Sequence, residues 1–405
     1  MVCGCSGAGA DISPSAMAEN GTVHVEPMIA IVEHEGNVAL DVEEEQDSEF
    51  QDVDRPWKPE SIRVATKTFS LRNMLDAIDE GSLDLAPDFQ RLQVWKPVQK
   101  ARLIESVLLQ IPLPAFYFAE DRDGTLRVVD GVQRLTTVHD FVRGGADGSG
   151  GFPLEGLEYI DDVTGKRFEE LPALWQRRLN NTQIVANVID PSTPRPVMYD
   201  IFKRINTGGT PLNAQEIRHC MSQKRSRDFL RDLTTVPEFA IATAGAMDRQ
   251  RRMIDREVAL RFCAFSLMGE QGYEPPMDLF LSRATELLDD PREVSDTQLR
   301  EIEQIFIVGL RNSIDIFGEY AFRKWPEGEE RRNPFNRALF ESWTVELARV
   351  GRIESASVTR GIRTRARHLM KDDPAYLAAV TASTGDRMRV RNRFELTREV
   401  IASAR

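Results

Sequence analysis

The chain has 405 residues, a formal net charge of −12 and an apolar content that is ordinary for a globular protein. No apolar run reaches the roughly 18–20 residues that a membrane helix needs, and the first residues lack the basic and apolar regions of a signal peptide. These features exclude a membrane-spanning helix and a membrane partner, and we expect a cytoplasmic protein with reduced cysteines.

The negative charge is concentrated at the N-terminus. Residues 1–54 contain thirteen Asp or Glu and no Lys or Arg, so the rest of the chain holds 52 bases against 51 acids. We predict that residues 1–61 are an acidic, largely disordered tail, in which Met28–Val32 and Val38–Val42 resemble a weak hairpin. Residues 351–405 carry twelve Arg or Lys against six acids, so they are the best candidate in the chain for a phosphate-facing surface, although such charge runs are more often a solvated helical face.

Local signals predict a series of short elements from Ile62 onward. A helix over Leu71–Asp79 is followed by one that starts at Pro97, because proline suits the first helical position. Another helix is predicted at Val132–Val142, and it ends on a glycine pair. The predicted strands are Ala115–Ala119, Thr125–Asp130 and Gln183–Ile189.

From about Arg195 onward, the apolar periodicity is helical. The sequence therefore predicts an α+β protein in which a mixed α/β domain, residues 62–210, precedes a helical domain, residues 211–405, with its basic C-terminal stretch. Asn213 and Glu216 have the spacing of a capping box. The strongest helical patterns are Ile254–Leu267, Leu279–Leu288, Leu299–Phe317 and Arg337–Val350.

The segment around Asp130 carries the clearest chemical signal. An apolar strand ends in Asp130-Gly131 and a helix begins at once, so backbone N–H groups and a positive dipole end are offered to an anion. Arg134 in the first turn opposes that dipole, which bidentate phosphate binding would explain. Asp130 is suited to hold a metal ion or orient a water, and Gln133 to position that water or read a base. The structural alternative is that Asp130 is an N-cap and pairs with Arg134.

Two further segments accompany this turn. Gln90-Arg91 lies between aromatic residues ahead of the helix at Pro97, and Phe202–Leu212 places a glycine pair after a short helix. Each alone is typical of a helix-entry turn or a turn between helices. Their order along the chain is more specific than either segment.

With Leu103-Ile104-Glu105-Ser106 and Asp130–Leu135, the ordered set resembles one family. It is similar to the ParB/sulfiredoxin-like N-terminal domain of GmrSD type IV restriction enzymes and of related phage-defence proteins. Arg252–Glu257 and Leu339-Phe340-Glu341 also resemble segments of such proteins, so the resemblance covers roughly residues 62–350.

The resemblance implies that the turn binds and hydrolyses a nucleoside triphosphate of unspecified base, with Mg²⁺ as a further cofactor, coupled in larger relatives to DNA cleavage. Val132 stands where the family has Gln. Hydrolysis is weakened if that Gln contacts the nucleotide, and is unaffected if it only starts the helix. Carried over residue by residue, the catalytic residues are Asp130, Gln133 and Arg134, and the nucleotide-binding residues are Gln90, Arg91, Gly131, Arg204, Asn206, Thr207 and Gly208.

The five histidines form no His-Asn-His nuclease motif, and the four cysteines fit neither a disulfide framework nor a zinc site. We therefore expect no metal site of the protein's own and no nuclease activity of the chain alone. His139 is expected to be a packing or surface residue. If DNA is cut, a separate nuclease or defence-system partner cuts it.

The leading prediction is a nucleotide-binding, NTP-hydrolysing regulator related to phage-defence and type IV restriction systems. The alternative is a non-enzymatic, ParB-like DNA-binding module, and a third reading is a scaffold or antitoxin-like partner. On a strand, residues 387–393 would place four arginines on one face; salt bridges within the helical domain are the competing explanation. The candidate DNA-binding residues are Arg360, Arg363, Arg365, Arg367, Arg387, Arg389, Arg391 and Arg393.

Overall fold

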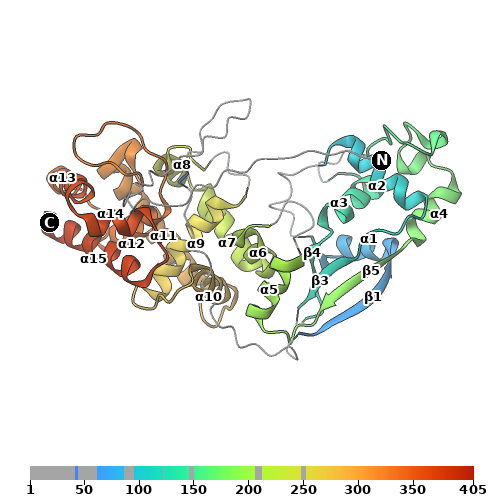
Figure 1. Ribbon diagram of the computed structural model, residues 1–405, viewed down its shortest axis with the longest axis horizontal. Coiled ribbons are helices and arrows are strands. Elements are labelled where there is room, and N and C mark those ends of the chain that lie inside the picture. The colour runs from blue at the N-terminus through green and yellow to red at the C-terminus, as the bar shows by residue number, and fades with distance from the viewer. Residues whose placement is uncertain are drawn as a thin grey trace, which may run out of the picture. The chain divides into compact units, whose positions relative to one another are not determined.

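The computed structural model describes residues 42–43, 62–85, 95–121, 123–145, 150–205, 212–247 and 252–405. Leu40–Arg405 form one compact unit. The described chain contains a five-stranded mixed sheet, followed by helices alone (Figure 1). The predicted α+β class is therefore confirmed. The strands are β1 (Val64–Ser70), β2 (Leu83–Asp84), β3 (Phe116–Glu120), β4 (Leu126–Asp130) and β5 (Gln183–Ile189).

Most of the described residues are helical. Each of the four periodic segments predicted in the second half coincides with a helix to within a few residues. The helices are α1 (Leu71–Asp79), α2 (Pro97–Leu108), α3 (Val132–Arg143), α4 (Ala173–Asn181), α5 (Arg195–Ile205), α6 (Ala214–Met221), α7 (Lys224–Thr235), α8 (Pro237–Thr243), α9 (Ile254–Met268), α10 (Met277–Asp289), α11 (Asp296–Phe317), α12 (Arg337–Arg349), α13 (Ala356–Asp372), α14 (Pro374–Thr381) and α15 (Arg387–Ala404), with 3₁₀ turns at Asp161–Val163, Phe168–Glu170 and Gly318–Tyr320.

The strands lie in the order β1-β5-β3-β4-β2. The β1–β5 and β3–β4 pairs are antiparallel, whereas the β3–β5 and β2–β4 pairs are parallel. Because β3 and β4 are antiparallel, the last residue of β4 lies beside the start of β3, and Asp130 pairs with Tyr117. This register fixes where the candidate turn leaves the sheet.

Several helix starts follow directly from local sequence. The Ser70 hydroxyl accepts a hydrogen bond from the Asn73 N–H and caps α1. Pro97 occupies the first position of α2, where its missing N–H costs no hydrogen bond. Asn213 and Glu216 form the predicted capping box, with bonds of 2.8 and 2.7 Å. Local chemistry therefore sets these three boundaries.

The sheet has hydrophobic clusters on both faces. Ile184, Ala186 and Val188 alternate along β5 and join a cluster with α1, α2 and α3. Ile189, on the opposite face of the strand, joins a second cluster with residues of α5 and α6. Figure 1 shows α5 and α6 beside β3 and β4, away from α2 and α3. The chain leaves the sheet on the face that carries α5 and α6.

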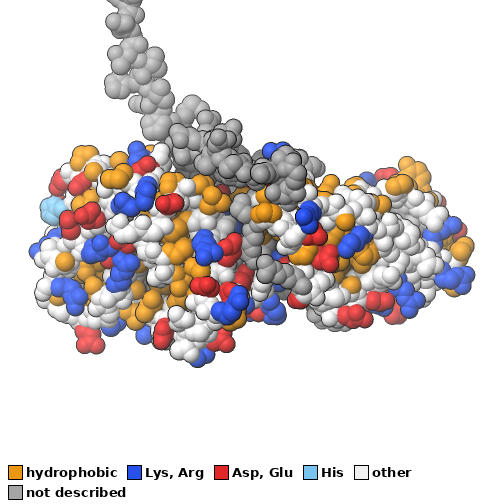
Figure 2. Space-filling view, turned by 90° about the horizontal axis from the view of Figure 1, so that it is seen from below, with side chains coloured by type: hydrophobic (Ala, Val, Ile, Leu, Met, Phe, Trp, Pro, Cys, Tyr) orange, Lys and Arg blue, Asp and Glu red, His pale blue; other side chains and the backbone are white. Residues whose placement is uncertain are grey.

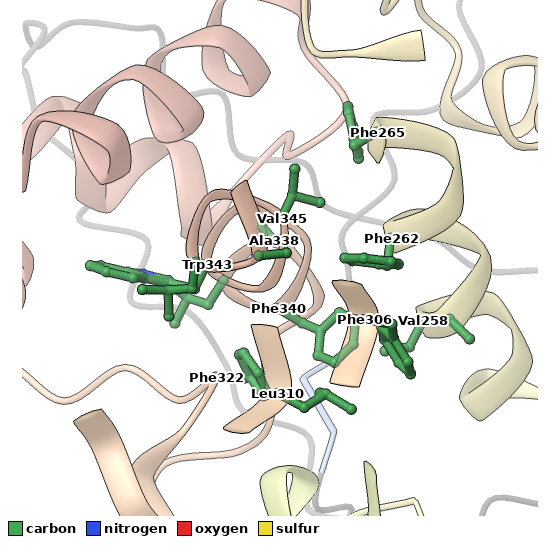
Figure 3. Close-up of a cluster of buried hydrophobic side chains, with 14 of the residues drawn as sticks. Val258, Phe262, Phe265, Phe306, Leu310, Phe322, Ala338, Phe340, Trp343 and Val345 are labelled. Carbon is green, nitrogen blue, oxygen red and sulfur yellow. The ribbon is translucent and has the colours of Figure 1, made fainter. Parts of the chain in front are cut away.

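The helices from α7 onward share a separate aromatic core. Figure 3 shows Phe262 of α9, Phe306 of α11 and Phe340 of α12 gathered in it. The Phe262 and Phe306 ring centroids are 4.8 Å apart, and the Phe306 and Phe340 centroids are 6.3 Å apart, separations at which aromatic pairs attract. The sheet and the helices from α7 onward therefore pack around separate hydrophobic cores.

Two of the predicted elements, the strand at residues 387–393 and the hairpin before residue 42, are not found in the described residues. The strand considered for residues 387–393 is wrong, because these residues begin α15. Most of the hairpin predicted before residue 42 lies outside the described residues; Val42 itself bridges to Phe335. No described helix has the length and apolarity needed to cross a membrane.

Candidate functional site

The turn after β4 has a geometry that only glycine fits. Gly131 is the N-cap of α3 with φ of +99°, and it has no side chain with which to cap the helix. A Cβ on Gly131 would lie 2.3 Å from Cδ1 of Phe116, which is itself buried in the sheet. The first-turn N–H groups of an α-helix have no acceptor within the helix. A glycine N-cap supplies no side-chain acceptor to these donors, an arrangement typical of helix starts that bind anions.

Arg134 braces this turn from within the fold. Its guanidinium donates to Asp130 Oδ2 at 2.9 Å, to the Ala115 carbonyl at 3.3 Å and to the Pro114 carbonyl. It also lies over the Phe116 ring, 4.2 Å from the centroid. Burial lowers the pKa of Arg134. These contacts tie together the end of β4, the start of α3 and the residues that lead into β3.

The structural alternative for the turn was that Asp130 is an N-cap and pairs with Arg134. The pairing is correct, but the cap assignment is wrong. Asp130 and Arg134 do form an ion pair. Asp130 is not the N-cap, because it completes β4 by pairing with Tyr117 and Gly131 takes the cap position. The Asp130 side chain remains 41% exposed, against 12% for Arg134. The carboxylate is thus the more accessible partner.

The next two residues of α3 face different surroundings. The Val132 side chain is buried in the same cluster as Leu135 and Val138. Gln133 is only partly buried, and its carbonyl accepts a hydrogen bond of 2.7 Å from the Thr137 hydroxyl. In this chain, the position at which the family has its first Gln therefore faces the core.

The remaining predicted nucleotide residues are only partly described. Arg204 is exposed near the end of α5. Gln90, Arg91, Asn206, Thr207 and Gly208 lie outside the described residues.

A further arginine, which the sequence analysis did not assign to the site, stands at the start of α9. Arg252 Nη2 donates to Glu216 Oε2 at 2.7 Å, and Arg252 Nε donates to Glu216 Oε1 at 3.3 Å. Its carbonyl accepts a hydrogen bond of 2.8 Å from the Asn213 side chain. The resemblance at Arg252–Glu257 was the signal that could have identified this residue.

The basic residues of α13 are partly engaged with the protein. Arg363 donates to the carbonyls of Asp315 and Ile316. Arg367 pairs with Glu330 at 3.1 Å and lies over the Trp325 ring. Arg365, in contrast, is exposed. Only part of this helix is therefore open to a polyanion.

The arginines of α15 are distributed around the helix. Arg393 is fully buried and forms an ion pair with Glu341, so it cannot contact a surface phosphate. Arg389 donates to the Ala382 carbonyl, and Arg387 lies 3.9 Å from Glu274. The Nε of Arg391 is buried as well. Figure 2 shows Lys and Arg interspersed with Asp and Glu on the face that it presents.

A cleft of about 1640 Å³ opens where β3 ends and β4 begins. Its lining includes Glu120 and Arg127, but not Asp130 or Arg134, which lie at the other end of β4. The cleft is therefore separate from the candidate turn.

Among the described residues, no group of three or more His, Cys, Asp and Glu side chains could hold a metal ion.

His139 is engaged within the fold. Its Nε2 lies 2.8 Å from Asp79 Oδ1, which links α3 to the end of α1. This position agrees with the expectation of a packing or surface residue.

The fold and the turn define an α+β domain that presents a glycine-capped helix N-terminus beside an arginine-braced carboxylate. A family model described as GmrSD restriction endonuclease, N-terminal domain, matches residues 71–222, from α1 to the residue after α6. These residues therefore match the N-terminal domain family of GmrSD-type restriction endonucleases. No curated protein matches the chain.

Proposed function

We propose that the Asp130–Arg134 turn binds the phosphates of a nucleoside triphosphate and hydrolyses it. The observation that carries this proposal is the glycine-capped N-terminus of α3 beside the partly exposed Asp130 carboxylate. Backbone N–H groups and the helix dipole stabilise a phosphate. A carboxylate next to the helix start is suited to bind the Mg²⁺ that accompanies the phosphate. The matched residues 71–222 include this turn, at which the family resemblance implied nucleotide hydrolysis.

The side chains have distinct roles in this proposal. Asp130 holds Mg²⁺ or orients the attacking water, and Gln133 positions that water. Arg134 acts through Asp130: its buried guanidinium fixes the carboxylate and the turn, instead of reaching into solvent for phosphate. Arg204 is a neighbouring candidate because it is exposed near the end of α5. Bound Mg²⁺ would neutralise phosphate charge.

The burial of Val132 supports retained hydrolysis. Val132 packs with Leu135 and Val138, so the side chain at this position anchors the start of α3 in the core. Replacement of Gln by Val therefore removes no group from the solvent side of the turn. In this proposal the domain is ParB/sulfiredoxin-like, acts in the cytoplasm and regulates a separate nuclease of a defence system.

Purified protein tests this function directly. We expect ATP or GTP to bind in the presence of Mg²⁺, and phosphate to be released on incubation. Absence of binding and turnover for all four common ribonucleoside triphosphates, with and without Mg²⁺, would refute it. His139→Gln provides a control within the same helix, because His139 bonds to Asp79 and has no proposed role at the turn.

A second candidate function is DNA binding by α13. The helix contains no Asp or Glu from Ala356 to Lys371, and Arg360 and Arg365 are exposed. A surface that neutralises DNA phosphates releases counterions, so its affinity falls steeply with salt. Binding of duplex DNA that is insensitive to NaCl would count against this surface.

A further inference from the structure

A β-bulge in β4 turns Asp130 toward the face of the sheet that carries α5 and α6. Phe118 of β3 pairs with Val128. The residue before it, Tyr117, pairs with Asp130 instead of Val129, so β4 holds one extra residue at this point. Residues that lie opposite each other in a β-ladder point to the same face, and Tyr117 packs against the cluster that contains Val129. Bulges of this kind re-aim side chains and are frequent beside active sites.

The same register extends a row of polar side chains from Asp130 across the sheet. Tyr117 also pairs with Asn187 of β5, and Asn187 pairs with Thr66 of β1. The Thr66 hydroxyl donates to Asn187 Oδ1 at 2.9 Å, so these two side chains share a face of the sheet. Adjacent strands lie about 4.8 Å apart, which places Tyr117 about 5 Å and Asn187 about 10 Å from Asp130 along the row. One nucleotide can span this row from its phosphates to its base.

The row lies at the border of the hydrophobic cluster on this face. Along β5, Ile189 is fully buried, Asn187 is partly buried and Val185 is 45% exposed. Tyr117 is partly buried as well. The face therefore opens to solvent in the direction of Val185, and a ligand held at Asp130 can reach Tyr117 and Asn187 from that side.

We propose that Tyr117 and Asn187 bind the nucleoside of the triphosphate whose phosphates lie at the Asp130 turn. This inference rests on the proposed function and adds the residues that contact the base and the ribose. An aromatic ring offers a stacking surface to any base. The Asn187 amide carries the donors and the acceptor that base edges and ribose hydroxyls need. Because Thr66 fixes this amide through Oδ1, its Nδ2 donors are oriented before the ligand arrives, and less side-chain entropy is lost on binding.

The test is calorimetric titration of Mg²⁺-ATP, Mg²⁺-GTP and Mg²⁺-tripolyphosphate into the full chain, Tyr117→Leu and Asn187→Leu. Tripolyphosphate has the phosphate chain of a nucleotide without the nucleoside. Leucine keeps apolar volume in the row but offers neither a ring face nor an amide. We expect each substitution to raise the dissociation constant of the nucleotide that binds by about fivefold or more, as when a stacking contact or a hydrogen bond is lost. The affinity for tripolyphosphate should stay unchanged.

Gln183→Leu is a matched control, because Gln183 carries an exposed amide on the same face of β5 as Asn187. We expect this variant to bind all three ligands like the wild type. If the wild type binds a nucleotide and both row variants bind it equally well, the nucleoside assignment is overturned while the proposed function stands. The same holds if the row variants lose nucleotide and tripolyphosphate alike. If the wild type binds no nucleotide, the proposed function itself fails.

Discussion

Replacement of Gly131 by alanine gives the sharpest structural test of the turn. The backbone there has φ of +99°, and a Cβ would lie 2.3 Å from Cδ1 and 2.8 Å from Cε1 of Phe116. The left-handed conformation costs a residue with a Cβ about 1–2 kcal/mol, and overpacking of a core costs about 1–3 kcal/mol more. We expect Gly131→Ala to lower the free energy of unfolding by about 2–5 kcal/mol.

Gly124→Ala separates the two contributions. Gly124 also has a positive φ, +86°, but an added Cβ would meet nothing within 4 Å. Its substitution should cost only the conformational part, about 1–2 kcal/mol. Urea unfolding measures both variants, and a cycle with Phe116→Ala isolates the steric part, because Gly131→Ala should then cost no more than Gly124→Ala. An equal cost of the two single substitutions in the presence of Phe116 would refute the close packing of the turn.

Three further predictions concern the helical part of the chain. Glu341→Gln should lower the free energy of unfolding by about 3–5 kcal/mol in urea, because it leaves the buried charge of Arg393 unpaired; a loss below 1 kcal/mol would contradict the pair. Burial alone would raise the pKa of Glu257. The positive charges of Arg261, Arg337 and Arg218 outweigh this effect and lower the pKa to about 2. Since this folded-state pKa is depressed from 4.5, the stability that Glu257 contributes is present above pH 4.5 and is lost as pH falls toward 2. The difference in unfolding free energy between wild type and Glu257→Gln should therefore narrow over that interval, and a difference that stays constant would argue against it. If α13 binds duplex DNA, Arg365→Ala should reduce the slope of log affinity against log salt by about 1, and an unchanged slope would remove Arg365 from the interface.

Elements with local signals could be predicted from the sequence. Pro97 and the Asn213–Glu216 spacing each mark a helix start through bonds within a few residues. β1 and β2 carried no such signal. Most β1 side chains are exposed and show no alternation, and β2 has two residues that are ordered by pairing with β4.

The C-terminal helix shows how a charge pattern can mislead. The alternating arginines of residues 387–393 raised the possibility of a strand, but buried Val390, Phe394, Thr397 and Ile401 have helical spacing. Arg393 finds its partner Glu341 on another helix, 52 residues away in sequence. Periodicity identifies the helix, whereas long-range pairing requires the tertiary structure.

The candidate turn was predictable in position but not in detail. A strand that ends in Asp130-Gly131 predicts the helix start, yet only the β3–β4 register moves the cap from Asp130 to Gly131. The orientation of Arg134 toward Pro114 and Ala115 depends on the loop that precedes β3. Spacing predicts its pairing with Asp130 but not its role as a brace, because the Pro114 and Ala115 carbonyls lie about 20 residues away in sequence.

In the proposed function, nucleotide phosphate and Mg²⁺ meet at Asp130. Titration of the triphosphate into Asp130→Asn, with and without Mg²⁺, tests it most directly. We expect the wild type to bind more tightly when Mg²⁺ is present and Asp130→Asn to lose this Mg²⁺-dependent gain. The same gain in both proteins would contradict the assignment of Asp130.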